Sequence, residues 1–272
     1  MNKDIKYFEA IAERAQERQS NRNGKEAEAI RLIKREKIAA HVSLPPTDLN
    51  KLARHLKVHE IRHVPLAMKG RLMLEGKSIT IEINHSLSEF DKRYATAHEL
   101  AHLILEKKRL SICSLISANQ KDQFGRSHFL TENLCDNGAE EILLPVQWLR
   151  DRLMHYTPSL EIIDEISKEA NCDLSFVAER IIKKGLWHCK VLLCVKRGKK
   201  LCVIKTFPPA DEAFLAFMEP FDLETSLPGN SLINKKFMEG HLRIKSGDED
   251  YLYRAQCIPV NEKVVLSMII YN

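Results

Sequence analysis

The sequence predicts an α+β fold, in which a mainly helical part with a small antiparallel sheet is followed by a smaller α/β part. Apolar residues recur at helical spacing through most of the chain up to Trp187. The segment GRLMLEGKSITIEIN interrupts these helices with the alternation of a hairpin, and beyond Trp187 such alternation dominates. We therefore expect a domain boundary near residue 187.

The first expected elements lead into the hairpin. Residues 1–44 are expected to form an N-terminal helical segment, because their apolar residues recur every three or four positions. Another helix is expected to begin near Thr47, directly behind a pair of prolines. The hairpin turns at Glu75-Gly76, and the alternating isoleucines of ITIEIN mark a half-buried strand.

Helices are expected between the hairpin and the boundary. Ser88, with Asp91 three residues later, can cap the helix that carries the motif HELAH. A second helix is expected over ENLCDNGAEEILL, with Thr131 as its N-cap and Pro145 beyond its end. Residues 158–187 have the pattern of two short helices.

Strands are expected to dominate after the boundary. The segment KVLLCVKRGKKLCVIKTF predicts a hairpin that turns at Arg197-Gly198. A helical stretch is expected near residues 210–218, and the strands HLRIKS, YLYRAQCIPV and KVVLSMIIY follow it.

The composition is that of an ordinary globular protein. Of its 272 residues, 44% are hydrophobic and 29% charged, and the net charge of +5 permits a nucleic-acid or acidic partner without requiring one. No apolar run approaches the roughly 20 residues of a membrane span, and the charged N-terminus has no signal-peptide core, so we expect a cytoplasmic protein that does not bind membranes. The 7 cysteines are scattered and form no C-x-x-C pair, which argues against a disulfide framework.

The motif HELAH predicts a zinc site. In a helix, His98 and His102 lie one turn apart on the same face, where both imidazoles can reach one metal ion, and Glu99 can act as the base that deprotonates water. A five-residue pattern also occurs by chance in unrelated helices. Here the surrounding residues are almost all apolar, which predicts a buried helix whose polar side chains need partners.

A third ligand should come from a second helix that faces the first. Glu132 is favoured by its spacing, with Asp136 one turn later to orient a histidine through its second ring nitrogen. Glu140, Glu141 and His128 are the alternatives.

Two segments resemble the ImmA/IrrE zinc metallopeptidases. KRYATAHELAHLIL is similar to that family's R-F-T-x-A-H-E-L-G-H segment, and ENLCDNGAEEILLP is similar to its E-x-x-A-N/D-x-F-A-x-x-L-L-x-P segment. The similarity implies a zincin-like peptidase domain over residues 45–187. The sequence departs from the pattern at Ala101, where the family has glycine, and at Cys135 and Gly138, where it has alanine and phenylalanine.

The resemblance also implies a site and a function. It assigns His98, His102 and Glu132 as ligands of Zn²⁺ and Glu99 as the general base. The family's members cleave a helix-turn-helix repressor, and so derepress stress, DNA-damage or phage-defence genes. Residues 188–272 have the size and strand content of the GAF-like sensor domain that some members carry, which would respond to single-stranded nucleic acid or a small molecule.

Two further hypotheses concern an alternative function and the regulation of the site. The alternative function is a DNA-binding regulator with a structural or vestigial zinc site, since the helix pair at 158–187 has helix-turn-helix length, although its apolar residues are better explained as core. Glu99 argues against that alternative, because a structural site needs no base. We also expect Cys113 to act as an inhibitory thiolate ligand in the resting enzyme, although a buried thiol is the simpler interpretation.

Overall fold

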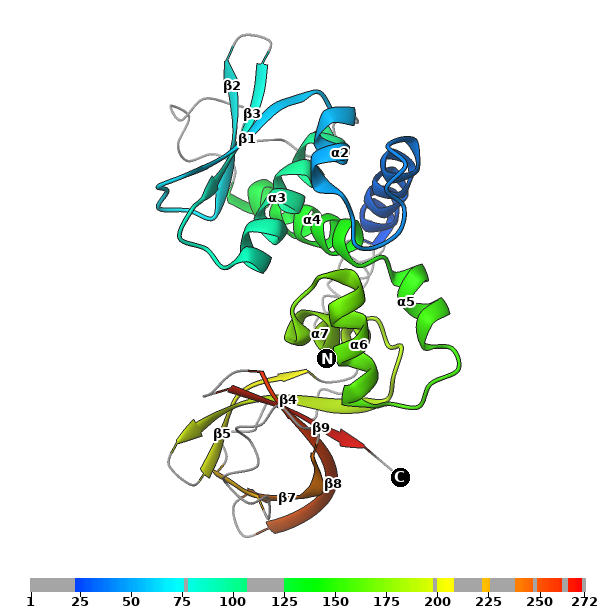
Figure 1. Cartoon of the computed structure of the whole chain (residues 1–272), viewed down its shortest axis with the longest axis vertical. Coiled ribbons are helices and arrows are strands. Elements are labelled where there is room, and N and C mark those ends of the chain that lie inside the picture. The colour runs from blue at the N-terminus through cyan, green and yellow to red at the C-terminus, as the bar shows by residue number, and fades with distance from the viewer. Residues whose placement is uncertain are drawn as a thin grey trace, which may run out of the picture. The chain divides into compact units, whose positions relative to one another are not determined.

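The structure is a computed structural model, which describes residues 23–75, 78–106, 125–197, 200–207, 222–225, 238–246, 249–260 and 264–270 (Figure 1). The chain divides into two compact units, Met1–Pro145 and Val146–Asn272. Among the helices of the described ranges, none is long and apolar enough to cross a bilayer. The predicted boundary near residue 187 falls inside the second unit, where helices give way to strands.

A three-stranded sheet follows the short helix α2 (Leu49–His55). Its strands lie in the order β1 (Val58–Val64), β3 (Ser78–Asn84) and β2 (Gly70–Glu75). The hairpin β2–β3 is antiparallel as predicted, but β1 pairs with β3 in parallel, so the sheet is mixed rather than antiparallel. Strand β1 was missed because VHEIRHV is an edge strand with mostly exposed or half-buried side chains and no apolar alternation.

Helix α3 (Glu89–Glu106) packs against β2 and β3 and carries the motif HELAH. The predicted cap is confirmed, since the backbone N–H of Asp91 donates to Ser88 Oγ at 3.1 Å and Ser88 Oγ donates to Asp91 Oδ2 at 2.7 Å. The expected burial is also confirmed, because every residue from Ala95 to Leu105 except His98 is buried.

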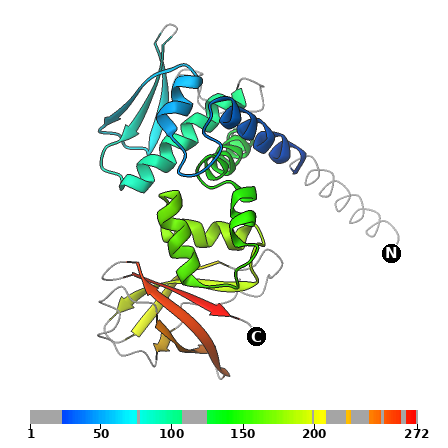
Figure 2. The same cartoon turned by 45° about the vertical axis from the view of Figure 1, so that its right-hand side comes forward.

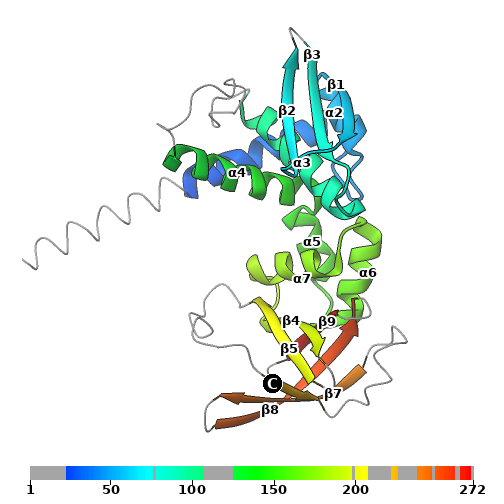
Figure 3. The ribbon, with the colours of Figure 1, turned by 90° about the vertical axis from the view of Figure 1, so that its left-hand side faces the viewer.

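Helix α4 (Gly125–Leu143) packs on α3 (Figure 3). It begins well before the predicted N-cap Thr131, which is instead a buried residue inside the helix. Its C-terminal carbonyls are bound by two side chains from the preceding part of the unit. Lys37 Nζ donates to the carbonyl of Ile142 at 2.7 Å and to that of Glu141 at 3.2 Å, and Thr47 Oγ1 donates to Ile142 at 2.6 Å.

A helix over residues 23–39 joins this packing. At the contact, Gly138 of α4 lies so close to α3 that an added Cβ would be 2.9 Å from the Cβ of Ala101, and 3.5 Å from Cδ1 of Ile33. The departures from the family pattern at Ala101 and Gly138 therefore meet in space. Because Gly138 has no side chain, the methyl group of Ala101 fits at this contact.

The second unit begins with α5 (Val146–Leu153) and the predicted helix pair, α6 (Leu160–Ala170) and α7 (Leu174–Lys183). Ser159 caps α6, and Asn171 ends it in the left-handed conformation. Most of the apolar residues of this pair are buried, as the core interpretation requires. Ile163, Ile166, Val177 and Ile181 are fully buried, whereas Ile162 and Phe176 are half-buried.

Beyond the helix pair, six antiparallel strands form a closed barrel in chain order (Figure 2). They are β4 (Cys189–Arg197), β5 (Lys200–Phe207), β6 (Asp222–Thr225), β7 (Met238–Ser246), β8 (Glu249–Pro259) and β9 (Val264–Ile270). The predicted hairpin β4–β5 is confirmed, and α7 packs against it. The helical stretch expected near 210–218 lies outside the described residues, and the GAF-like assignment stays a prediction.

Candidate metal centre

Helices α3 and α4 bring His98, His102 and Glu132 together. The Nε2 atoms of the two histidines are 3.0 Å apart. Glu132 Oε2 lies 3.2 Å from Nε2 of His98, and Oε1 of the same carboxylate lies 3.5 Å from Nε2 of His102. Two imidazole nitrogens and a carboxylate thus point at one small space between the helices.

These distances fit a tetrahedral metal ion. Zinc binds histidine nitrogen and carboxylate oxygen at about 2.0–2.1 Å, which places neighbouring ligand atoms of a tetrahedron about 3.3 Å apart. The observed distances between the ligand atoms, 3.0, 3.2 and 3.5 Å, lie on both sides of that value. The half-exposed side of the cluster is formed by Glu132, so a water or substrate oxygen can reach a fourth position.

Asp136 lies behind the ring of His98. Its Oδ1 lies 2.9 Å from Nδ1 of His98, on the side of the ring away from the cluster, and it also accepts a hydrogen bond from the hydroxyl of Tyr94 at 3.3 Å. A histidine that binds metal through Nε2 donates its Nδ1–H to such a partner, which fixes the tautomer and the ring. Glu132 and Asp136, one turn apart on α4, thus contact opposite nitrogens of the His98 ring.

Cys135 holds the equivalent position behind His102. This position was not predicted from the sequence. Its Sγ lies 3.2 Å from Nδ1 of His102, and both residues are buried. Cys135 follows Glu132 by three residues and so shares its face of α4. That spacing was the available signal.

Glu99 is buried beside the first residue of β2. An added Cβ on Gly70 would lie 3.3 Å from Glu99 Oε1, which places the carboxylate at the end of the sheet where Gly70 pairs with Ile83. Burial raises the pKa of Glu99, although the nearby histidines oppose the shift. A carboxylate with a raised pKa is suited to accepting and returning a proton near neutral pH.

The charges of the cluster shift the pKa values of its other members. Burial lowers the pKa of His98, but hydrogen bonds with Asp136 and Glu132 outweigh it and raise the pKa to about 9. Hydrogen bonds from His102 and His98 hold the pKa of Glu132 far below its ordinary value. Burial raises the pKa of Asp136, but its bond with His98 and the charge of that ring lower it overall.

Comparisons with known proteins agree with this geometry. Residues 67–181 match the family model Peptidase_M78, described as the IrrE N-terminal-like domain. This part of the chain is similar to the ImmA/IrrE-type domain. A solved structure described as a Mycobacterium tuberculosis transcriptional regulator is similar over 92% of this chain and 77% of the other chain. The TM-score is 0.54 and the sequence identity 11%, so the similarity is one of fold. The comparison with curated proteins gives no match.

The ImmA/IrrE family is one of metallopeptidases, and the donor set found here suits zinc. Of the alternative third ligands, Glu141 is buried elsewhere, with its carboxylate 3.7 Å from Nζ of Lys34, and Glu140 is not part of the cluster. The side chain of His128 and the whole of Cys113 lie outside the described residues. The inhibitory role of Cys113 therefore stays a prediction.

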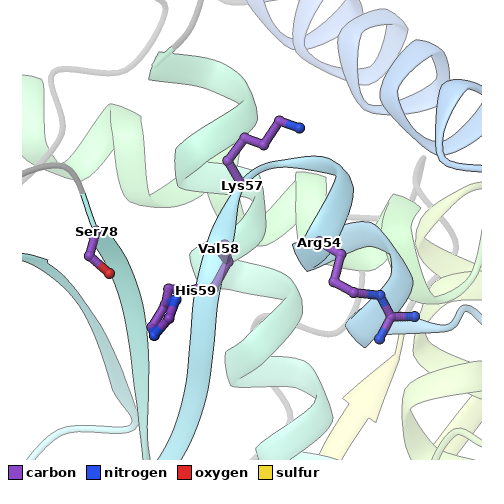
Figure 4. A pocket seen from close by; sticks show the side chains of 5 residues that line it. All are labelled: Arg54, Lys57, Val58, His59 and Ser78. Carbon is purple, nitrogen blue, oxygen red and sulfur yellow. The ribbon is translucent and has the colours of Figure 1, made fainter.

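A hollow of about 590 Å³ lies elsewhere in the first unit (Figure 4). It is lined by Arg54, Lys57, Val58, His59 and Ser78. Ser78 begins β3, whereas the residues near Glu99 lie at the opposite end of that strand. Figure 4 shows the side chains of Arg54 and Lys57 pointing away from His59, so the charged groups do not converge on one ligand.

Proposed function

We propose that the protein is a regulated, site-specific zinc endopeptidase that cleaves a helix-turn-helix repressor. The observation that carries the proposal is the meeting of two imidazole nitrogens and a carboxylate at tetrahedral spacing, next to a buried glutamate. A site with a structural role alone has no use for that glutamate. The family match supports the peptidase chemistry, and the repressor as substrate follows from the family resemblance.

In this proposal, His98, His102 and Glu132 hold the ion, and Glu99 moves the proton. A zinc ion bound there would polarise the scissile carbonyl and lower the pKa of the attacking water. Glu99 takes the proton from that water and delivers it to the leaving amine nitrogen. Burial of Glu99 raises its pKa and makes it an effective proton carrier.

The test is co-expression with the helix-turn-helix protein encoded nearest to the gene. Wild type should release fragments of that protein, and Glu99→Gln should abolish cleavage while zinc stays bound, because the amide cannot accept the proton. Glu89→Gln is the matched control, since Glu89 lies on the same helix with an exposed side chain paired to Lys92. Cleavage by Glu99→Gln at the wild-type rate would contradict the proposal.

We also propose that residues 188–272 regulate cleavage as a sensor. The barrel is joined to the helix pair within the second unit, where the backbone N–H of Leu160 donates to Oε1 of Gln256 at 2.9 Å. Single-stranded nucleic acid or a small molecule is the proposed signal. Adding single-stranded DNA to the zinc-loaded chain and its repressor should speed cleavage, and an unchanged rate would leave the small molecule as the candidate.

The alternative, a DNA-binding regulator with a structural zinc, makes a different prediction. The transcriptional regulator with a similar fold is the observation in its favour. Its expected reading helix, α7, however, buries Val177, Ile181 and even Arg180. Under this alternative, Glu99→Gln would leave every activity unchanged.

A further inference from the structure

Each histidine of the cluster has a partner on α4 behind its ring. For His98 the partner is the carboxylate of Asp136, 2.9 Å from Nδ1, and for His102 it is the thiol of Cys135, 3.2 Å from Nδ1. Both partners are neighbours on α4, and both contacts lie on the Nδ1 side, away from the Nε2 atoms that face each other. The two rings are therefore held in the same way by different chemical groups.

We propose that Cys135 is the positioning residue of His102. A neutral imidazole that gives Nε2 to a metal carries its proton on Nδ1, and that N–H must find an acceptor when it is buried. The sulfur of Cys135 is that acceptor: it selects the tautomer of His102 and fixes the angle of its ring. The inference rests on the proposed metal site and adds a residue to it.

Burial explains why a thiol serves at one ring and a carboxylate at the other. Asp136 is half exposed, with 49% of its side chain accessible, so its charge remains solvated. Cys135 is fully buried, where an ionised carboxylate would lose its hydration. A neutral sulfur can accept a weak hydrogen bond there at little cost of desolvation.

The position of Cys135 is a departure from the family pattern, in which alanine is usual. An alanine methyl group cannot accept a hydrogen bond. The contact with His102 is therefore a property of this chain, and it makes the metal affinity depend on a buried sulfur atom.

The test compares the full chain with three variants of Cys135. Zinc affinity is measured by competition with a chromophoric chelator, and ring orientation by the visible absorption spectrum of the Co²⁺-loaded protein. Cys135→Val fills the space with a slightly larger apolar side chain, Cys135→Ala removes the sulfur, and Cys135→Ser replaces the sulfur by a hydroxyl oxygen that can accept. Cys172→Ala is the matched control, because its thiol is also buried but donates to the carbonyl of Ala170. Asp136→Ala is the reference, because it removes the acceptor behind the other ring.

We expect Cys135→Val and Cys135→Ala to weaken zinc binding about tenfold, the lower end of the range for lost outer-shell partners, and to shift the Co²⁺ bands. Cys135→Ser should lie closer to wild type than either, and Cys172→Ala should equal wild type. If Cys135→Ala does not fold, the Val and Ser variants decide. A folded Cys135→Val with wild-type affinity and spectrum would overturn the inference while leaving the metal site intact. A wild-type chain that binds neither metal would overturn both.

Discussion

An added Cβ on Gly138 would lie 2.9 Å from the Cβ of Ala101, closer than two such carbons can approach. The crossing of α3 and α4 therefore depends on a glycine at this point, and the same crossing sets the distance between the histidines and Glu132. The family pattern instead has glycine at the position of Ala101 and phenylalanine at the position of Gly138.

Gly138→Ala should accordingly destabilise the protein by about 1–3 kcal/mol, the usual cost of overpacking, and weaken zinc binding. Ala101→Gly should suppress the defect when combined with it, because it removes the opposing methyl group. Chemical unfolding and zinc titration of the two single variants and the double variant measure the coupling. Additive effects would show that the contact does not control the crossing.

Gly70→Ala should reduce cleavage more than zinc binding. The new methyl group would lie 3.3 Å from Oε1 of Glu99 and 2.9 Å from Cδ1 of Ile83, so the proposed base must shift while the cluster on α3 and α4 stays in place. Gly24→Ala is the control, because nothing lies within 4 Å of its added Cβ. Equal losses of zinc and activity would mean that Gly70 supports the whole site rather than Glu99.

The metal-free protein should lose stability as the pH rises from about 6.5 to about 9. His98 has an ordinary pKa of 6.5 and a folded-state pKa of about 9, so its proton stabilises the fold fully below the lower value. That contribution disappears as the pH passes the upper value. Thermal unfolding in chelator, compared with His98→Gln across this range, isolates the effect. Zinc affinity should change in the opposite direction, because the proton competes with the ion.

Lys37→Met should destabilise the chain by about 1–3 kcal/mol, because it leaves the buried carbonyl of Glu141 without this donor. The loss at Ile142 should be smaller, since Thr47 continues to donate to that carbonyl. Lys51→Met is the control, because Lys51 makes one hydrogen bond of this kind at an exposed site, to His41. Urea unfolding of both variants measures the difference.

Local signals in the sequence were sufficient for several elements. Ser88 and Asp91 marked the start of α3, and alternating isoleucines marked β3, because caps and periodicity act between near neighbours. The early start of α4 and strand β1 were missed, since their patterns are weak and tertiary packing determines them. The spacing of Glu132 and Asp136 predicted their positions opposite the motif.

The contacts of single atoms between helices could not be predicted in the same way. The spacing of Cys135 from Glu132 indicates its face of α4, but not that its sulfur meets His102, and no local pattern indicates that Gly138 faces Ala101. Such contacts depend on the rotation and crossing of two helices that are far apart in the chain. They became evident only from the packed structure.

The most direct test of the central claim is the zinc content of the purified chain beside that of two variants. Wild type should hold about one zinc ion per chain, as expected for two histidines and a facing carboxylate. His98→Ala combined with His102→Ala should hold none, and Glu132→Ala should hold less than wild type. A wild-type chain without zinc, or a double histidine variant that keeps all of it, would contradict the assignment of this cluster as the metal centre.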